Sequence, residues 1–142
     1  MALVRRLAFA ALLVAAACGG STAPRRETRR LALVDERISS RAAVWLPITA
    51  RVGAPFDVEI TAIVGTECAS FTDADMHVAG LVATVTPYVT IDPRCGGHVP
   101  FEARSFPVRF DRAGAGLVRV RVRSAAADGA ETVIERAVTV GP

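Results

Sequence analysis

The chain of 142 residues contains no lysine, asparagine or glutamine, so arginine carries all of its permanent positive charge. This usage indicates a GC-rich genome rather than a function. The missing lysine also excludes a phosphate-binding loop at residues 113–116, because AGAG has neither the lysine nor the following helix that such a loop requires. The sequence predicts a hairpin turn there instead.

Catalytic motifs are missing as well. Ser70 and Ser105 are the serines near the ends of predicted strands, and neither lies in a G-x-S-x-G sequence. His77 and His98 are the two histidines, and no carboxylate pattern that would orient an imidazole accompanies them. We therefore expect a protein that is not an enzyme and that needs no cofactor.

Two metal-binding interpretations have limited support. A zinc site would take its thiolates and imidazoles from Cys68, His77, Cys95 and His98. Only the CGGH segment has the spacing of zinc ligands, so we expect no zinc and place both histidines in loops. Asp73 and Asp75 offer oxygen ligands for calcium, but the glycine and the terminal glutamate of a calcium loop are absent. We expect no metal at either place.

The one strongly apolar run lies near the N-terminus. It covers residues 7–17, follows Arg5 and Arg6, and is too short to cross a hydrocarbon core of roughly 30 Å as a helix. A positive start, a short apolar centre and small residues at the exit are typical of an export signal. The sequence predicts a signal peptide over residues 1–17.

The end of this run, Ala15-Ala16-Ala17-Cys18, resembles the lipobox of bacterial lipoproteins, whose cysteine is diacylated and becomes the first residue. Ala15 departs from the leucine that most of these proteins carry. The resemblance implies a lipid anchor at Cys18 and a place in the cell envelope, in the outer membrane facing the periplasm or the cell surface. Ordinary cleavage near Ala17 without a lipid is the alternative.

Residues 18–30 have the composition of a flexible tether between the anchor and a domain. Their arginines, Arg25, Arg26, Arg29 and Arg30, are either a solvated linker or a contact for anionic lipid headgroups. We favour the solvated linker, since charge runs usually have no ligand.

Charge excludes nucleic acid as a partner. Loss of Arg5 and Arg6 with the signal peptide reduces the 17 arginines to 15, against 14 acidic residues. A balance so close to zero lacks the basic footprint of a polyanion-binding protein.

Residues 31–142 have the size of one domain of about 110 residues. They are rich in valine, threonine, isoleucine and phenylalanine, are interrupted by glycine and proline, and show no sustained helical period. One or two strands in 31–52, a pass through DMHVA (75–79) and further strands over 55–64, 81–91, 106–110, 116–124 and 132–140 bring the expected total to seven or eight. The sequence predicts an all-β domain of two antiparallel sheets packed face to face.

Period-two alternation predicts which side chains are buried. The residues expected inside are Phe56, Val58, Ile60, Ala62, Val64, Leu81, Ala83, Val85, Val89, Ile91, Phe106, Val108, Phe110, Val118, Val120 and Val122. Between them we expect Thr84, Thr86, Tyr88 and Thr90 outside, whereas the inward face of 132–140 is ambiguous. Pro87 indicates an edge strand or a bulge.

The segments ARVGAPFDVEI (50–60) and FDRAGAGLVRVRVR (110–123) resemble bacterial immunoglobulin-like domains of surface proteins, where similar turns lead into an early and a late strand. The resemblance implies an immunoglobulin-like β-sandwich and says nothing of an activity. The whole chain also resembles small uncharacterised lipoproteins.

Cys68 and Cys95 are the cysteines left in the domain. Export to an oxidising compartment favours a disulfide between them. The chain between them is expected to run through DMHVA, turn at Gly80 and return, which brings both cysteines to one end of a hairpin.

Arg119, Arg121 and Arg123 form an outward row, which Arg109 from a neighbouring strand is expected to join. Such a row either binds anionic groups of an envelope glycan or protein, or pairs across strands with Glu131, Glu135 or Glu59. We favour the pairing.

The function expected from these observations is a lipid-anchored module that binds or assembles with an envelope protein or glycan. A purely structural accessory domain without a ligand is the alternative, with a metal-binding envelope domain well behind it. The oligomeric state is left open.

Overall fold

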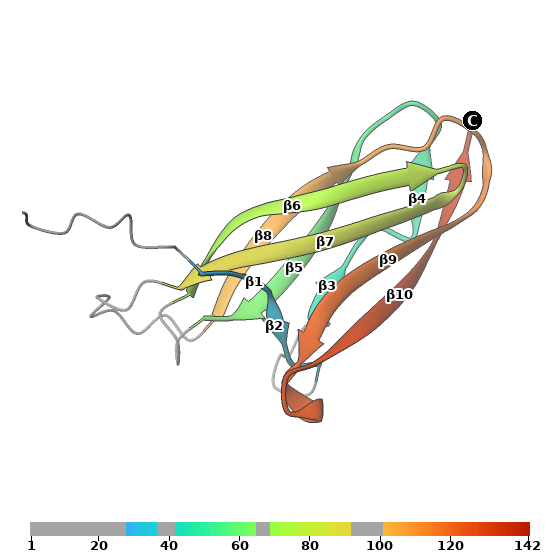
Figure 1. Cartoon of the computed structure of the whole chain (residues 1–142). Helices are drawn as coiled ribbons and strands as arrows, with labels where there is room; N and C mark the ends of the chain where they lie inside the picture. The colour runs from blue at the N-terminus through green and yellow to red at the C-terminus, as the bar shows by residue number, and fades with distance from the viewer. Residues whose placement is uncertain (1–27, 37–41, 65–68, 92–100) are drawn as a thin grey trace, which may run out of the picture.

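The computed structural model describes residues 28–36, 42–64, 69–91 and 101–142 (Figure 1). Their elements are β1 (Thr28–Leu31), β2 (Leu33–Val34), β3 (Val44–Trp45), β4 (Thr49–Arg51), β5 (Phe56–Ile63), β6 (Ala69–Ala79), β7 (Val82–Ile91), β8 (Phe101–Val108), β9 (Gly114–Ser124), the 3-10 helix η1 (Ala125–Ala127) and β10 (Ala130–Gly141). The all-β class is confirmed. These ranges hold ten strands rather than seven or eight, because the N-terminal part forms four short strands instead of one or two.

The strands make two sheets. The larger one has the order β1-β7-β9-β10-β4, with β2 also on β9 and β6 also on β7, and the smaller one has the order β3-β5-β8. In Figure 1, β5 and β8 lie behind β6 and β7. β9 and β10 lie beside β7, on the side away from β6. The side chains buried between these strands form one hydrophobic core.

The larger sheet is mixed, so the expectation of purely antiparallel sheets is wrong for it. The pairs β7–β9, β2–β9 and β4–β10 are parallel, whereas the smaller sheet is antiparallel throughout. The reason for the first of these is the path of the chain. After β7 it runs back through β8 in the other sheet, and it therefore re-enters the larger sheet in the direction of β7.

The same path corrects the prediction for AGAG. Residues 109–113 connect β8 in one sheet to β9 in the other, and Gly114 already belongs to β9. No hairpin turn forms at residues 113–116. The hairpins of the larger sheet lie instead at Gly80–Leu81, as expected, and at η1 with Asp128–Gly129.

Alternation places most of the core as predicted. The buried hydrophobic residues that match the prediction are Phe56, Val58, Ile60, Ala62, Val64, Ala83, Val85, Val89, Phe106, Val108, Phe110, Val118, Val120 and Val122. Leu81 and Ile91 are only half-buried. In β10, where the inward face was ambiguous, Ile134, Val138 and Val140 are buried.

β7 departs from the prediction at Thr86 and Pro87, which are both buried. Pro87 lies where β7 changes its neighbour from β9 to β1, and its carbonyl oxygen accepts a hydrogen bond of 3.0 Å from Ala32 N–H. A residue at such a change needs no N–H of its own, so proline fits inside the sheet. β7 is not an edge strand, and the irregularity lies in β6, between Phe71 and Asp73.

The first described strand crosses the expected domain boundary. β1 starts at Thr28, so the boundary placed between residues 30 and 31 falls inside a strand, and Arg29 and Arg30 belong to the sheet rather than to the tether. The predictions for residues 1–27, which include Cys18, and those for Cys68, Cys95 and His98 lie outside the described residues.

Phe110→Ala should lower the free energy of unfolding by about 3–5 kcal/mol. Phe110 is fully buried, its ring centroid lies 5.8 Å from that of Phe56, and its ring packs over Gly116. Val133→Ala on β10 is the control, because Val133 is 50% exposed and should change stability by no more than about 0.5 kcal/mol. Equal losses in urea unfolding of the two variants would contradict this core.

Candidate functional site

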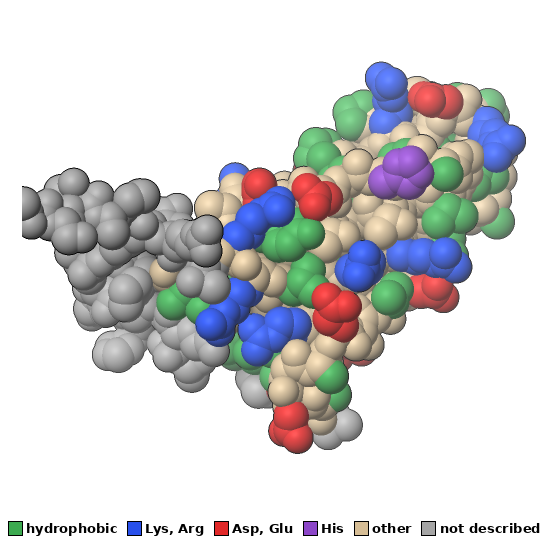
Figure 2. Space-filling view, viewed as in Figure 1, with side chains coloured by type: hydrophobic (Ala, Val, Ile, Leu, Met, Phe, Trp, Pro, Cys, Tyr) green, Lys and Arg blue, Asp and Glu red, His purple; other side chains and the backbone are tan. Residues whose placement is uncertain are grey.

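The arginine row of β9 is paired within the molecule. Arg119 Nε lies 2.9 Å from Glu135 Oε1, Arg121 Nη2 lies 3.5 Å from Glu131 Oε2, and Arg123 Nε donates a hydrogen bond of 3.1 Å to the carbonyl oxygen of Gly129. Figure 2 shows basic and acidic side chains side by side on this face. An anion would have to compete with these acceptors, so the arrangement favours cross-strand pairing over a ligand site.

Arg109 does not join this row. It follows β8, which pairs with β5 in the smaller sheet, and its Nε lies 3.4 Å from Asp111 Oδ1. The four arginines singled out from the sequence therefore belong to two different surfaces.

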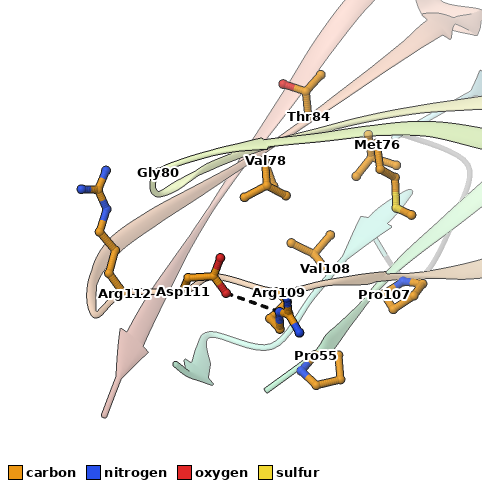
Figure 3. A pocket seen from close by; sticks show the side chains of 12 residues that line it. Pro55, Met76, Val78, Gly80, Thr84, Pro107, Val108, Arg109, Asp111 and Arg112 are labelled. Atoms are coloured by element: carbon orange, nitrogen blue, oxygen red, sulfur yellow. Dashed lines mark ion pairs between the residues drawn. The ribbon is translucent and has the colours of Figure 1, made fainter. Parts of the chain in front are cut away.

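Arg109 lies instead on a groove of about 690 Å³ between β6 and β8, which we call the β6–β8 groove (Figure 3). Its walls come from both sheets. Met76 and Val78 of β6 and Val108 of β8 point into it, and Pro55 and Pro107 line the opposite wall. The walls are mainly apolar, and the charged side chains lie at the rim.

The two strands are held together at one end of the groove. The rings of Phe71 and Phe106 meet edge to face, with centroids 5.9 Å apart. Glu102 Oε2 accepts a hydrogen bond of 3.2 Å from Phe71 N–H, and Arg104 Nη1 donates bonds of 2.9 and 3.2 Å to the carbonyl oxygens of Phe71 and Thr72. Side chains of β8 thus cover the backbone of β6 at its bulge.

The other end of the groove is open. Met76 is 48% and Val78 is 42% exposed. Arg112 lies against the turn at Gly80, where its guanidinium fills the space that a Cβ would need, and the Arg109–Asp111 pair lies nearby on the rim. Two exposed apolar side chains beside a cationic rim form a surface suited to another chain.

The two strands that border the groove differ in how their edges are protected. β8 pairs only with β5 among the described strands, and Pro107 removes an N–H from its free edge. β6 pairs only with β7 in the same ranges, and beyond the part covered by Glu102 and Arg104 it carries neither lysine nor proline on its edge. The sequence analysis missed this groove, although the apolar Met76 and Val78 in an otherwise polar strand were a visible signal.

A second polar cluster lies on the outer face where β1, β7 and β6 meet. Arg29 donates bonds of 3.2 and 3.0 Å to the two carboxylate oxygens of Asp73, lies 3.3 Å from Asp75 Oδ1, and stacks 3.5 Å from the ring centre of Tyr88. Tyr88 OH donates a bond of 3.0 Å to Asp75 Oδ2. That hydrogen bond, together with burial, raises the pKa of Tyr88, and the bond to Asp73 raises the pKa of Arg29.

In this cluster Asp73 and Asp75 share the single positive charge of Arg29. Sequence reasoning missed the cluster because it assigned Arg29 to the tether. Over the ranges that the structure describes, no group of three or more histidine, cysteine or acidic residues is placed to hold a metal.

The expectation that His77 lies in a loop is wrong. This residue lies in β6 and pairs with Thr84 near the Gly80 turn. Ala69, at the opposite end of the strand, lies about 25 Å away at the rise of an extended chain. The other residues of the zinc interpretation, Cys68, Cys95 and His98, lie outside the described residues.

Ser70 and Ser105 are exposed side chains on β6 and β8. They lie on the strands that border the groove, and within the described ranges no hydrogen bond joins either of them to a histidine.

Comparison with known families, curated proteins and solved structures finds no match to this chain. Among the described residues, no helix is long and apolar enough to span a membrane.

Asp75→Ala should lower the pKa of Tyr88. Loss of the phenol proton breaks the bond to Asp75 and places two negative charges together, so the fold favours the neutral phenol. This contribution to stability is present at neutral pH and is lost as the pH rises through the raised pKa. Tyr88 is the sole tyrosine, so alkaline absorbance titration reports on it directly.

Asp73→Ala is the matched control, because Asp73 contacts Arg29 but makes no hydrogen bond to the phenol in this cluster. It should change the pKa of Tyr88 less than Asp75→Ala does. A Tyr88 pKa that is the same in the wild type and in Asp75→Ala would contradict the assignment.

Cys68 and Cys95 should form one disulfide, to be seen by mass spectrometry of the unreduced protein. Ala69, which follows Cys68, pairs with Ile91 at the end of β7, four residues before Cys95. Closing this loop should add roughly 3–4 kcal/mol, so reduction should lower the melting temperature by about 10–20 °C. A variant carrying Cys68→Ala and Cys95→Ala should melt like the reduced protein. Two free thiols, or bound zinc, would refute the disulfide.

Proposed function

We propose that the protein is a lipid-anchored module of the cell envelope, without enzymatic activity, that binds or assembles with another envelope protein through the β6–β8 groove. The groove is the observation that carries the proposal. It combines exposed apolar side chains, a cationic rim and a β-strand edge without a partner among the described residues. Strand addition to such an edge is a common mode of protein recognition.

A protein partner fits this surface better than a glycan. A glycan would be held by charged or amide side chains, but the arginines of β9 are occupied by Glu131, Glu135 and Gly129. The backbone edge of β6 and the apolar walls instead match an extended segment of polypeptide, whose alternate side chains enter a groove.

For the fold we propose a relative of the immunoglobulin-like sandwich. In support, β3–β5–β8 form one antiparallel sheet, β10 and β9 pair antiparallel in the other, and the chain crosses between the sheets. The parallel pair β7–β9 departs from that sandwich, whose sheets are antiparallel. The proposed relation to the immunoglobulin-like sandwich therefore concerns the packing of two sheets and not the pairing of every strand.

The alternative is an accessory domain without a ligand, and photo-crosslinking in intact envelopes separates the two. Amine-reactive reagents have no lysine to attack, so a photoreactive residue replaces Ala79, an exposed residue of β6 that follows Val78 on the edge where a partner strand would pair. A protein adduct should form there, and it should be lost when Val78→Lys is added. The same residue at Val133 on β10 is the control and should give no adduct. An adduct that Val78→Lys leaves unchanged would contradict the groove, and no adduct at Ala79 would favour the accessory domain.

Cys18→Ala should release the protein from membranes, because a diacylated Cys18 is the only strong anchor that the sequence offers. Detergent-phase partitioning of the two proteins measures this, with the wild type in the detergent phase and the variant in the aqueous phase. Equal partitioning would mean that Ala15 prevents recognition of the lipobox.

A further inference from the structure

The N–H and C=O groups of β7 point alternately toward β6 and away from it. This alternation determines which residues of β6 have backbone groups that β7 does not pair. The carbonyl oxygens of Leu81 and Pro87 accept hydrogen bonds of 2.8 Å from Leu117 and 3.0 Å from Ala32, on the side of β7 away from β6. Backbone groups alternate in direction along a strand. The backbone groups of every odd-numbered residue from Leu81, just before β7, to Pro87 therefore point away from β6.

Val78, Met76 and Ala74 are the β6 residues opposite these odd-numbered positions. Their N–H and C=O groups consequently point to the open edge of β6, where the described part of the chain supplies no partner. The side chains of β8 cover the edge only at Phe71 and Thr72. A ladder of three alternate residues, about 13 Å long, is left for another strand.

This edge is complementary to itself around a two-fold axis beside Met76. Antiparallel pairing of Met76 with the partner's Met76 places Ala74 opposite the partner's Val78 and Val78 opposite the partner's Ala74. All of these residues direct their backbone groups outward, so the three pairs exchange about six hydrogen bonds. An isologous contact of this kind closes as a dimer and cannot extend into a fibre.

The side chains agree with this register. Asp75 would lie opposite the partner's His77, so carboxylate and imidazole meet twice on the outer face. The bonds from Tyr88 and Arg29 already hold the Asp75 carboxylate in place. On the inner face, the exposed Met76 and Val78 of both copies would cover each other and close both grooves.

We propose that the β6–β8 groove is occupied by a second copy of this chain, which pairs β6 with β6 and joins the two larger sheets into one. The inference rests on the proposed function, because it names the protein that docks at the same surface. A second copy is favoured over a strand of a different protein by the match of Asp75 to the partner's His77 in the register that satisfies the backbone.

Light scattering after size exclusion tests the proposal on the full chain carrying Cys18→Ala, at micromolar to submillimolar concentrations. We expect a concentration-dependent dimer. Met76→Pro removes an N–H that points outward, so it should weaken the dimer by about tenfold or more while the fold survives. His77→Pro, one residue further, removes an N–H directed at β7 and should instead lower the melting temperature.

Val78→Lys is a second disrupting variant, because it keeps every backbone group and places a charge on the edge. It should weaken the dimer as Met76→Pro does, and Val133→Lys on β10 should leave the dimer unchanged. A chain that stays monomeric throughout overturns the proposal, and so does a dimer that persists in both disrupting variants.

The same variants separate this inference from the proposed function. If the chain is monomeric and Val78→Lys still abolishes crosslinking at Ala79 in envelopes, the groove holds a strand of a different protein and the proposed function stands. If Val78→Lys changes neither the dimer nor the crosslinking, both proposals are wrong.

Discussion

Burial of one face of β9 is the constraint on which the rest of the structure depends. Val118, Val120 and Val122 are completely buried, and β9 pairs with β7, β10 and β2. Side chains alternate along a strand, so burying the valines forces the intervening arginines onto the outer face. On that face the arginines pair with glutamates of β10 and with a carbonyl oxygen in the hairpin. The arginine row is therefore a consequence of the core rather than a sign of a ligand.

The groove has a different origin, in the way the sheets are connected. Because β9 lies next to β7, the hairpin partner β6 is left at the margin of the larger sheet, facing the margin strand β8 of the smaller one. The Phe71–Phe106 contact and the bonds of Glu102 and Arg104 draw these two strands together at one end only. Toward the Gly80 turn the strands separate, and apolar side chains on their facing sides remain in contact with solvent.

Long periodic strands could be predicted from the sequence, and short or interrupted ones could not. The alternation in residues 55–64 and 116–124 was long enough to identify the buried face correctly. β2 and β3 have two residues each, too few for a period, and they exist because a neighbouring strand offers backbone partners. Thr86 and Pro87 were misjudged for a similar reason, since a change of neighbour within β7 has no signature in the residues themselves.

The arginine row of β9 and the cluster around Arg29 differ in the same respect, namely in how far apart in the sequence their paired residues lie. Glu135 was one of three glutamates expected to pair with the arginine row, and its pairing with Arg119 is local because a hairpin joins their strands. Arg29 and Asp73 are separated by 44 positions, and only the docking of β1 beside β7 brings them together. The groove likewise combines β6 with β8, two strands that share no hydrogen-bonded pairing in the described structure.

The sequence by itself determined the all-β class, the buried faces of β5 and β9 and the β6–β7 hairpin. These features depend on side-chain alternation and on turns between residues close in the chain, which are local properties. The tertiary structure alone decided the parallel placement of β7 beside β9, the pairing of β1 with β7, and the edge of β6 that is left open by the described residues. Each of these results from the packing of segments far apart in the sequence, where backbone groups and apolar faces select among partners that the local pattern does not distinguish.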